Sequence, residues 1–458
     1  MKAISKFYIP LLLLWVGLHV FGIFRNGYGV EEDSLTAAYT AYEIYSSGEY
    51  HISRLPGHPI FEFLLGTTWP IRQLMWPIFV GLGMVLTGIF GRQILERHGV
   101  SPENSFLFLG ALMIPVMRFS LGETMEYTLS LGTLVAAWNF GQKGNWLLGA
   151  VFLAISTGLR IPNLIFGLPI FLLIWDRNSL LQSIYFSLFT FALSAVAYIP
   201  VYQLLGFEFF DTYELPYPPL LKIIYKGTIG VWGILGLLGI CIGLLGVHWS
   251  RVIKRIDLPF AAYALAFLFS LGLFIALPEK SAFLLPFTVL IVGLVIVNGR
   301  PLFLKLSFAL LFLNPLFLGT DLVDEYRGIP DEQVDISIPA GGQTLGIQLF
   351  FPDVAAKMDN KEATVLKLMG EMHQIEGEAF VVTGWWYPFL QMAHFKYPLD
   401  RLTMNIEYVY YADENQIMTA LREGKSIFFT PEAEIFNEQR YGHDLLARYG
   451  KPLINTAP

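Results

Sequence analysis

The sequence holds only one cysteine, Cys241, which lies inside an apolar run. A single cysteine excludes a disulfide within the chain and any metal site built from several thiolates. Charged side chains are also scarce, at 15% of 458 residues, and the formal net charge is -7. Because nucleic-acid-binding proteins carry basic patches, this balance predicts no nucleic-acid partner. None of the eight histidines falls in the His-Glu-x-x-His spacing of zinc enzymes.

Hydrophobic residues, by contrast, make up 54% of the chain and gather in long runs before about residue 320. This profile is typical of a polytopic α-helical membrane protein. The runs lie near residues 7–24, 74–91, 105–118, 126–140, 146–158, 162–175, 183–203, 228–247, 258–277, 282–298 and 301–319. They predict about eleven transmembrane helices, although each half of 146–175 is shorter than the roughly 20 residues that a span needs.

The ends of these runs predict an orientation in the membrane. The first run has no small-residue cleavage site after it, so we expect an uncleaved anchor with a cytoplasmic N-terminus. With eleven crossings, most loops rich in Lys and Arg fall on the cytoplasmic side. We therefore predict a multi-pass protein of the plasma (inner) membrane. Residues 1–320 would form the membrane domain, with a first external loop at 25–73, and residues 321–458 would be extracytoplasmic.

The tail after about residue 324 has the composition of a soluble domain. β-branched and aromatic runs predict strands at Val334–Ile338, Ala379–Thr383, Thr403–Tyr411 and Ser426–Thr430. Helical periodicity predicts helices at Val354–Ile375, Glu414–Glu423 and Ala433–Tyr449. The alternation indicates a small α/β domain. Because no glycine-rich phosphate loop is present, we interpret this domain as a lid or recognition module.

An amphipathic helix is predicted at residues 33–48, lying on the outer leaflet. Its apolar and aromatic face consists of Leu35, Ala38, Tyr39, Tyr42 and Tyr45. Asp33 is expected at the N-cap, where free backbone N–H groups and the helix dipole favour an ionised carboxylate. An ordinary cap on a surface helix is the plainer interpretation of this aspartate.

A longer pattern follows from Asp33: D-x14-G-[ED]-Y-x3-R-L-x-G-x-P-x-F-E. Its members are Asp33, Gly48, Glu49, Tyr50, Arg54, Leu55, Gly57, Pro59, Phe61 and Glu62. The pattern resembles the first external loop of glycosyltransferase family 39, which includes protein O-mannosyltransferases and lipid A aminoarabinose transferases and belongs to the GT-C membrane glycosyltransferases. The resemblance covers residues 33–62 closely and the rest of the membrane portion only in architecture. Two positions depart from the family: Ser34 replaces a second acid, and Phe63-Leu64-Leu65 replaces Lys-Pro-Pro.

The resemblance implies an inverting enzyme that takes a sugar from a polyprenyl-phosphate carrier at an outward-facing site. It also implies that the first acid of this loop is the essential carboxylate, a role that falls on Asp33, with Glu31 and Glu32 as rivals. A carboxylate suits the chemistry because a sugar hydroxyl is a poor nucleophile and must lose its proton as the new bond forms.

The leaving phosphate needs positioned cations or a metal ion. Arg54 is the first candidate for binding the donor phosphate, followed by Lys280, Arg160 and His58. Each has a plainer interpretation: Arg54 and Lys280 could contact lipid headgroups, and Arg160 could extend from a helix end towards water.

A second acidic site lies at Gly122-Glu123-Thr124-Met125-Glu126. The resembling family carries an acid at the start of this helix, which corresponds to Glu123, and Glu126 would share its face. Together with Asp33, Glu123 could hold Mg²⁺ or Mn²⁺. An acid that only stabilises the helix start is the alternative.

We further assign Glu62 and Glu126 to substrate binding. Trp385, Trp386 and Tyr387 could stack on a sugar ring, although such a group is more often part of a core.

The sequence thus predicts a glycosyltransferase that acts on an acceptor hydroxyl of a glycan, lipid or protein, in contact with membrane lipids. A transporter or flippase of lipid-linked sugars is the alternative, and it predicts internal repeats and ionisable groups near the bilayer midplane. We find no convincing repeat, and the charges lie mainly at helix ends, although the broken region 146–175 favours this alternative. A receptor whose tail binds a ligand leaves the first-loop pattern without a purpose.

Overall fold

The fold is known from a computed structural model of the chain. It describes residues 28–29, 31–210, 217–254, 257–278, 280–324, 328–340, 343–350, 356–396, 404–408, 414–430 and 448–453, together with Leu13, Gly17 and Ala433. The predicted apolar run at 7–24 and most of the predicted helix Ala433–Tyr449 lie outside these residues.

Four described helical segments are long and apolar enough to cross a membrane. They are Trp69–Arg97 (η1, Trp69–Ile71, with α4, Arg72–Arg97), α10 (Leu180–Ala197), α16 (Leu258–Ala276) and Ser281–Asn298 (η5, Ser281–Leu284, with α17, Leu285–Asn298). A fifth is present if Leu220–Trp232 and Ile234–Leu245, bent by 85° at Gly233, count as one span. The chain is therefore a helical, membrane-embedded protein.

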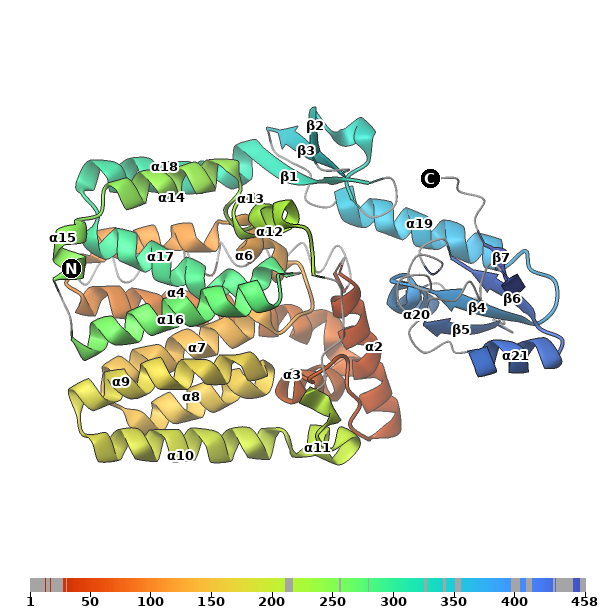
Figure 1. The fold of residues 1–458 in the computed structure, drawn as a ribbon, viewed down its shortest axis with the longest axis horizontal. Helices are drawn as coiled ribbons and strands as arrows, with labels where there is room; N and C mark the ends of the chain where they lie inside the picture. Colours follow the sequence, from red (N-terminus) through yellow and green to blue (C-terminus); the bar gives the residue numbers. More distant parts are fainter. Residues whose placement is uncertain are drawn as a thin grey trace.

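The predicted number of about eleven spans is not found among the described residues, and helix length is the reason. The apolar runs between 105 and 175 form η2 (Phe106–Leu112), α6 (Pro115–Leu121), α7 (Tyr127–Gln142), α8 (Trp146–Leu159) and α9 (Gly167–Arg177). The longest of these has 16 residues, below the roughly 20 that a span needs. Figure 1 nevertheless shows α7, α8 and α9 lying alongside α4 and α10 in one bundle.

Helix α7 is the central helix of this bundle, and nearly all its residues are buried. It approaches α4 closely at two glycines: a Cβ at Gly83 would lie 2.2 Å from the Thr128 carbonyl, and one at Gly132 would lie 2.3 Å from the Gly83 oxygen. Small residues at such contacts let helix backbones pack together. This packing fixes the N-terminal end of α7, which Glu126 directly precedes.

Two helices, α2 (Glu32–Ser47) and α3 (Pro59–Thr67), begin the described part of the bundle, and Figure 1 shows α2 lying across the end of the bundle. The prediction that Asp33 is the N-cap of this helix is wrong. Glu31 is the N-cap and makes no side-chain cap hydrogen bond, and Asp33 lies in the first turn. The buried face of α2, which packs on α3 and on the tail helix α20 (Tyr387–Lys396), agrees with the predicted face only in part. Leu35 and Ala38 are buried as predicted, but Ala37 and Ala41 are buried as well, and Tyr45 is 52% exposed.

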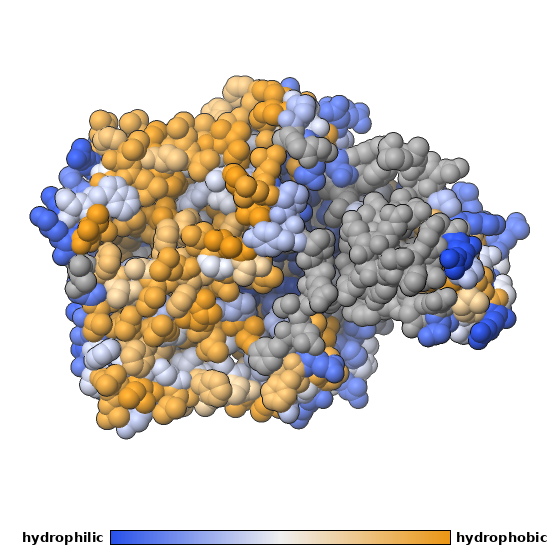
Figure 2. Space-filling model, viewed as in Figure 1, coloured by the Kyte–Doolittle hydropathy of each residue, from blue (hydrophilic) through white to orange (hydrophobic). Residues whose placement is uncertain are grey.

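The helical part ends with α14 (Ile234–Leu245) packed against α18 (Pro301–Phe317). The remaining short helices are α5 (Pro102–Ser105), η3 (Ile161–Phe166), α11 (Ile199–Leu205), η4 (Glu208–Phe210), α12 (Leu220–Gly227), α13 (Ile229–Trp232), α15 (Trp249–Ile253) and η6 (Asp331–Gln333). On the face that Figure 2 shows, hydrophobic residues cover most of the bundle, and hydrophilic residues lie at its ends and on the tail. Such a wide apolar surface suits contact with lipid.

The tail contains two sheets. The first is antiparallel, with the order β1-β3-β2, and pairs β3 (Gln343–Leu349) with both β1 (Leu318–Val323) and β2 (Ile336–Ala340). The second is parallel, with the order β5-β4-β6-β7; its strands are β4 (Ala379–Thr383), β5 (Met404–Tyr408), β6 (Ser426–Phe429) and β7 (Lys451–Pro452). Helices α19 (Ala356–Met372), α20 and α21 (Glu414–Arg422) accompany them.

The strand β4 spans the predicted residues, and β5, β6, α19 and α21 lie within their predicted ranges. Strands β1 and β3 and helix α20 were not predicted. One hydrophobic core joins α2 to the tail, since Leu35 and Trp69 belong to the same buried cluster as Met369 and Trp386.

Candidate functional site

The loop between α2 and α3 is organised by one buried carboxylate, Glu62. Its Oε1 accepts hydrogen bonds from the Ser53 backbone N–H at 2.8 Å and from the Ser53 hydroxyl at 2.6 Å. Its Oε2 accepts from the Tyr50 hydroxyl and from the His58 backbone N–H at 3.1 Å. Because the loop's own donors occupy both oxygens, Glu62 acts as a positioning residue here, whereas the sequence predicted a substrate contact. The arrangement accounts for the spacing from Tyr50 to Glu62.

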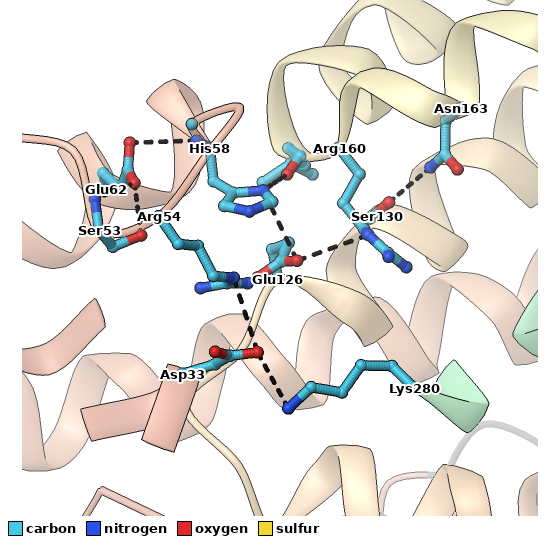
Figure 3. Close-up of polar contacts among 12 residues, drawn as sticks. Asp33, Ser53, Arg54, His58, Glu62, Glu126, Ser130, Arg160, Asn163 and Lys280 are labelled. Carbon is cyan, nitrogen blue, oxygen red and sulfur yellow. Dashed lines mark hydrogen bonds and ion pairs between the residues drawn. The ribbon is translucent and has the colours of Figure 1, made fainter. Parts of the chain in front are cut away.

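This loop carries Arg54 to the start of α7. The Arg54 guanidinium donates through Nη2 to Glu126 Oε2 at 2.6 Å, and its Nε lies 3.9 Å from Asp33 Oδ2 (Figure 3). Arg54 thus connects the first turn of α2 with the N-terminus of α7. Its Nη1 is buried and makes no hydrogen bond within the described part of the chain.

Glu126 is the most enclosed of the charged groups, with only 1% of its side chain exposed. Its Oε1 lies 3.5 Å from Arg160 Nε and 3.6 Å from His58 Nδ1. Arg160 ends α8 at the break that the sequence suggested, and its guanidinium lies 4.5 Å from the ring centres of both Tyr127 and Phe283. Cation–π contacts of this kind hold the guanidinium in place.

Lys280, in the turn between α16 and η5, lies 3.1 Å from Asp33 Oδ2 and 3.1 Å from Glu31 Oε2. Figure 3 shows its side chain reaching Asp33 from the opposite side to Arg54. Three acids and three bases therefore alternate in one chain of contacts, which we call the charged cluster: Glu31, Lys280, Asp33, Arg54, Glu126 and Arg160.

The charged cluster is open at one end and closed at the other. Lys280 and Asp33 have 32% and 29% of their side chains exposed, whereas Arg160 has 9%. Burial of charge is costly unless opposite charges compensate it, which the alternation achieves. A ligand from water or from the membrane surface would therefore meet Lys280 and Asp33 first.

The electrostatics keep the acids ionised. Burial by itself would raise the pKa of Asp33, but Lys280 and Arg54 outweigh it and hold that pKa below its usual value. Burial likewise opposes ionisation of Glu126, yet the cations Arg54 and Arg160 hold its pKa at about 2. Asp33 uses Oδ2 for both cations, and its Oδ1 has no hydrogen bond within the described residues. Asp33 therefore presents one unoccupied acceptor atom.

His58 was predicted to bind phosphate, but its environment keeps it neutral. Burial and Arg54 lower its pKa, and the opposing effect of Glu126 does not restore it. Its Nδ1 lies 2.7 Å from the Leu159 carbonyl oxygen, which can only accept a hydrogen bond, so Nδ1 carries the proton. A neutral imidazole adds little attraction for an anion, and His58 instead ties the loop to the end of α8.

Glu123 takes a different place from the one expected. It is 2% exposed, and its Oε2 accepts the backbone N–H of Glu31 at 3.2 Å, so that it holds the entry to α2. Asp33 contacts two cations instead of a second carboxylate. Among the described residues, no group of three or more His, Cys, Asp or Glu side chains could hold an ion. The divalent cation stays a prediction, and no step below is routed through it.

The remaining candidates lie outside the charged cluster. Glu32 acts electrostatically on Lys280 and adds to the negative field there. Trp386 is 4% exposed and packs on Phe389 in the core of the tail, as the packing interpretation expects. Trp385 lies against the same core, and Tyr387 begins α20.

Sequence reasoning missed two groups around the site. Asn163 Nδ2 donates to the hydroxyls of Ser130 (2.6 Å) and Ser156 (2.8 Å), which links the broken segment to α7. Burial by itself would raise the pKa of Glu31, but Lys280 lowers it. Lys357 and Lys361, on the tail helix α19, lower it further. Their four-residue spacing on a predicted helix was the available signal.

The chain matches no model of a protein family, and no curated protein resembles it significantly. Any functional conclusion therefore depends on the site itself.

Proposed function

We propose that this protein is an inverting membrane glycosyltransferase of the GT-C type, which moves a sugar from a polyprenyl-phosphate donor to an acceptor hydroxyl. The observation that supports it most is the place of Asp33. It is an ionised carboxylate with one unoccupied oxygen, set between Lys280 and Arg54 at the open end of the charged cluster.

Each part of the reaction has a group suited to it. The acceptor hydroxyl gives its proton to Asp33 Oδ1 as its oxygen bonds to the anomeric carbon. The anomeric carbon–oxygen bond to phosphate breaks, and the electron pair leaves with the phosphate. Lys280 and Arg54 compensate the growing negative charge, because positioned cations stabilise such a leaving group. Glu126 and Glu62 hold Arg54 and the loop in place.

The position of the site suits a lipid-carried donor. The charged cluster lies where the apolar bundle ends and the tail begins, as Figure 1 shows for α2 and α3. A prenyl chain could remain in the bilayer while its phosphate meets Lys280. In this proposal the N-terminus is cytoplasmic, the tail is extracytoplasmic in a plasma (inner) membrane, and the acceptor is a glycan, lipid or protein.

The test is transfer from a panel of polyprenyl-phosphate sugars in detergent and in liposomes, comparing the parent with Asp33→Asn. Loss of a positioned general base costs about 10²–10⁴ in rate, so we expect that loss for Asp33→Asn. Glu49→Gln is the matched control, because Glu49 is an exposed acid of the same loop region, and we expect it to transfer at the parent rate. A folded Asp33→Asn protein that transfers as fast as the parent would refute the role of Asp33.

A flippase of lipid-linked sugars is the second candidate, favoured by the broken segment from α8 through η3 to α9 and by the buried Arg160 in it. Discontinuous helices with buried charges are common in transporters. Movement of a labelled lipid-linked sugar across liposomes without a new glycosidic bond would favour this candidate.

A further inference from the structure

Lys280 and Arg54 are each shared between two carboxylates, and Asp33 is a partner of both. Lys280 Nζ lies 3.1 Å from Glu31 as well as from Asp33. Arg54 lies 2.6 Å from Glu126 but 3.9 Å from Asp33. If Asp33 gave up its contacts, each cation would still have its other carboxylate. Asp33 is therefore the partner that the cluster can release.

Apart from Glu31, Asp33 is the acid nearest to the open end of the charged cluster. Lys280 and Arg54 both contact the same oxygen of Asp33, Oδ2. A phosphate that arrives at Lys280 and Arg54 carries the same sign of charge as Asp33. The phosphate would bind the same two cations and would repel the Asp33 carboxylate.

We propose that a phosphate-bearing ligand displaces Asp33 from Lys280 and Arg54, so that binding of the anion is coupled to proton uptake by Asp33. The identity of the ligand, a prenyl phosphodiester, rests on the proposed function; the competition itself follows from the charged cluster.

The groups that face Asp33 decide the direction of this coupling. Lys280 and Arg54 favour its ionised form, whereas Glu31 on the same segment disfavours it. Tyr127, from α7, also interacts with Asp33, and Glu32 acts on Lys280. Lys357 and Lys361, from α19, act one step further away, on Glu31. An added anion opposes the two cations, so the pKa of Asp33 rises and the carboxylate becomes a stronger base. Donor binding would thus raise the basicity of Asp33 when the acceptor needs it.

The experiment is calorimetric titration of the detergent-solubilised full chain with farnesyl methyl phosphate, a phosphodiester with one charge throughout the pH range used. Comparing buffers of different ionisation enthalpy gives the number of protons taken up. We expect the parent to take up part of a proton near about pH 5, falling towards zero near about pH 8, because the usual pKa of an aspartate lies below that range. Glu49→Gln should behave as the parent.

Asp33→Asn should bind the probe without proton uptake. It should bind more tightly than the parent at about pH 8, by about tenfold for each unit by which the ligand raises the pKa in the parent. Lys280→Gln should weaken binding, which tests the cation side of the competition.

The outcomes separate this inference from the proposed function. Binding by the parent without proton uptake, or equal affinity of the parent and Asp33→Asn at about pH 8, would overturn the coupling and leave glycosyl transfer standing. Proton uptake in a protein that transfers no sugar would support the coupling and remove the proposed function. Failure of the parent to bind the probe would overturn both.

Discussion

The two ends of α7 carry polar clusters of different kinds. At its N-terminal end lies the charged cluster, in which acids and bases alternate over contacts of 2.6 to 3.9 Å. At its C-terminal end, roughly 24 Å away at 1.5 Å per residue, lies a second group, which we call the far-end cluster: Gln93, Arg97, His98, Trp138, Asn139, Gln142, Lys143 and Tyr263.

The far-end cluster is held by neutral partners. Arg97 donates to the Asn139 carbonyl oxygen at 2.9 Å and to its side-chain oxygen at 2.7 Å. The Tyr263 hydroxyl accepts from Gln142 at 2.5 Å and from Trp138 at 3.3 Å. Such hydrogen bonds fix helix ends, and the cations of the far-end cluster suit contact with anionic lipid headgroups. Proton transfer beside a departing phosphate needs both signs of charge, which the described contacts bring together at the charged cluster.

The largest expected effect comes from removing the acid that closes the charged cluster. Glu126→Ala leaves Arg54 and Arg160 buried without their shared carboxylate, and breaking a buried pair in this way costs about 3–5 kcal/mol. Thermal unfolding in detergent would measure the loss, with Tyr50→Phe, which removes one of four donors to Glu62, as a milder comparison of about 1 kcal/mol. An unchanged unfolding midpoint for Glu126→Ala would show that the cluster does not stabilise the fold.

Acid should weaken the N-terminal end of α7 selectively. The pKa of Glu126 is lowered from 4.5 to about 2 in the folded chain. A lowered pKa contributes stability that is fully present above the unfolded value and is lost as pH falls through the folded value. We expect the unfolding midpoint to drop between about pH 4.5 and about pH 2.

The controls for this pH scan are one variant at each end of α7. Glu126→Gln should make the profile shallower than that of the parent, because one titrating group is gone, whereas Tyr263→Phe should keep the slope of the parent. Equal slopes for the parent and Glu126→Gln would assign the acid sensitivity to other residues.

A smaller effect is expected at the far-end cluster. Tyr263→Phe removes an acceptor that Gln142 and Trp138 share, and leaving buried donors unsatisfied costs about 1–3 kcal/mol. Sugar transfer should not change once the protein is folded, because Tyr263 lies far from Asp33. A transfer rate that fell as far as for Asp33→Asn would contradict the division between the two ends.

The smallest effect is expected for Glu96→Gln. Glu96 pairs with Arg92 one turn away on α4 at 2.7 Å and is 36% exposed. Exposed pairs of this kind contribute about 0.3–0.5 kcal/mol. The unfolding midpoint in low and high salt would test this, and a loss comparable to that of Glu126→Ala would mean that exposure does not separate the two pairs.

Sequence periodicity predicted elements well where a segment contains its own signal. The strand β4 lies where a β-branched and aromatic run predicted it, and α19 and α21 follow the helical pattern. The sequence also predicted Asp33 as the base, Arg54, Lys280 and Arg160 as phosphate-binding and Glu126 as substrate-binding, and the structure places these five in the charged cluster. The predicted residues Glu123, His58 and Glu62 make other contacts beside it. The sequence pattern alone could not tell which of Glu123 and Glu126 contacts Arg54. Both lie near the start of one helix, and only packing decides which of them faces Arg54.

Hydrophobicity and residue spacing, which act along the chain, determined that this is a helical membrane-embedded protein with an α/β tail and an acidic first loop. The number of spanning helices, the burial of α2 between α3 and α20, and the pairing of Asp33 with Lys280 were decided by the tertiary structure. These features depend on contacts between residues far apart in the sequence, such as Asp33 and Lys280, which are 247 positions apart (280 minus 33). Such contacts form only when the packed bundle brings distant charges together in a place where water cannot screen them fully.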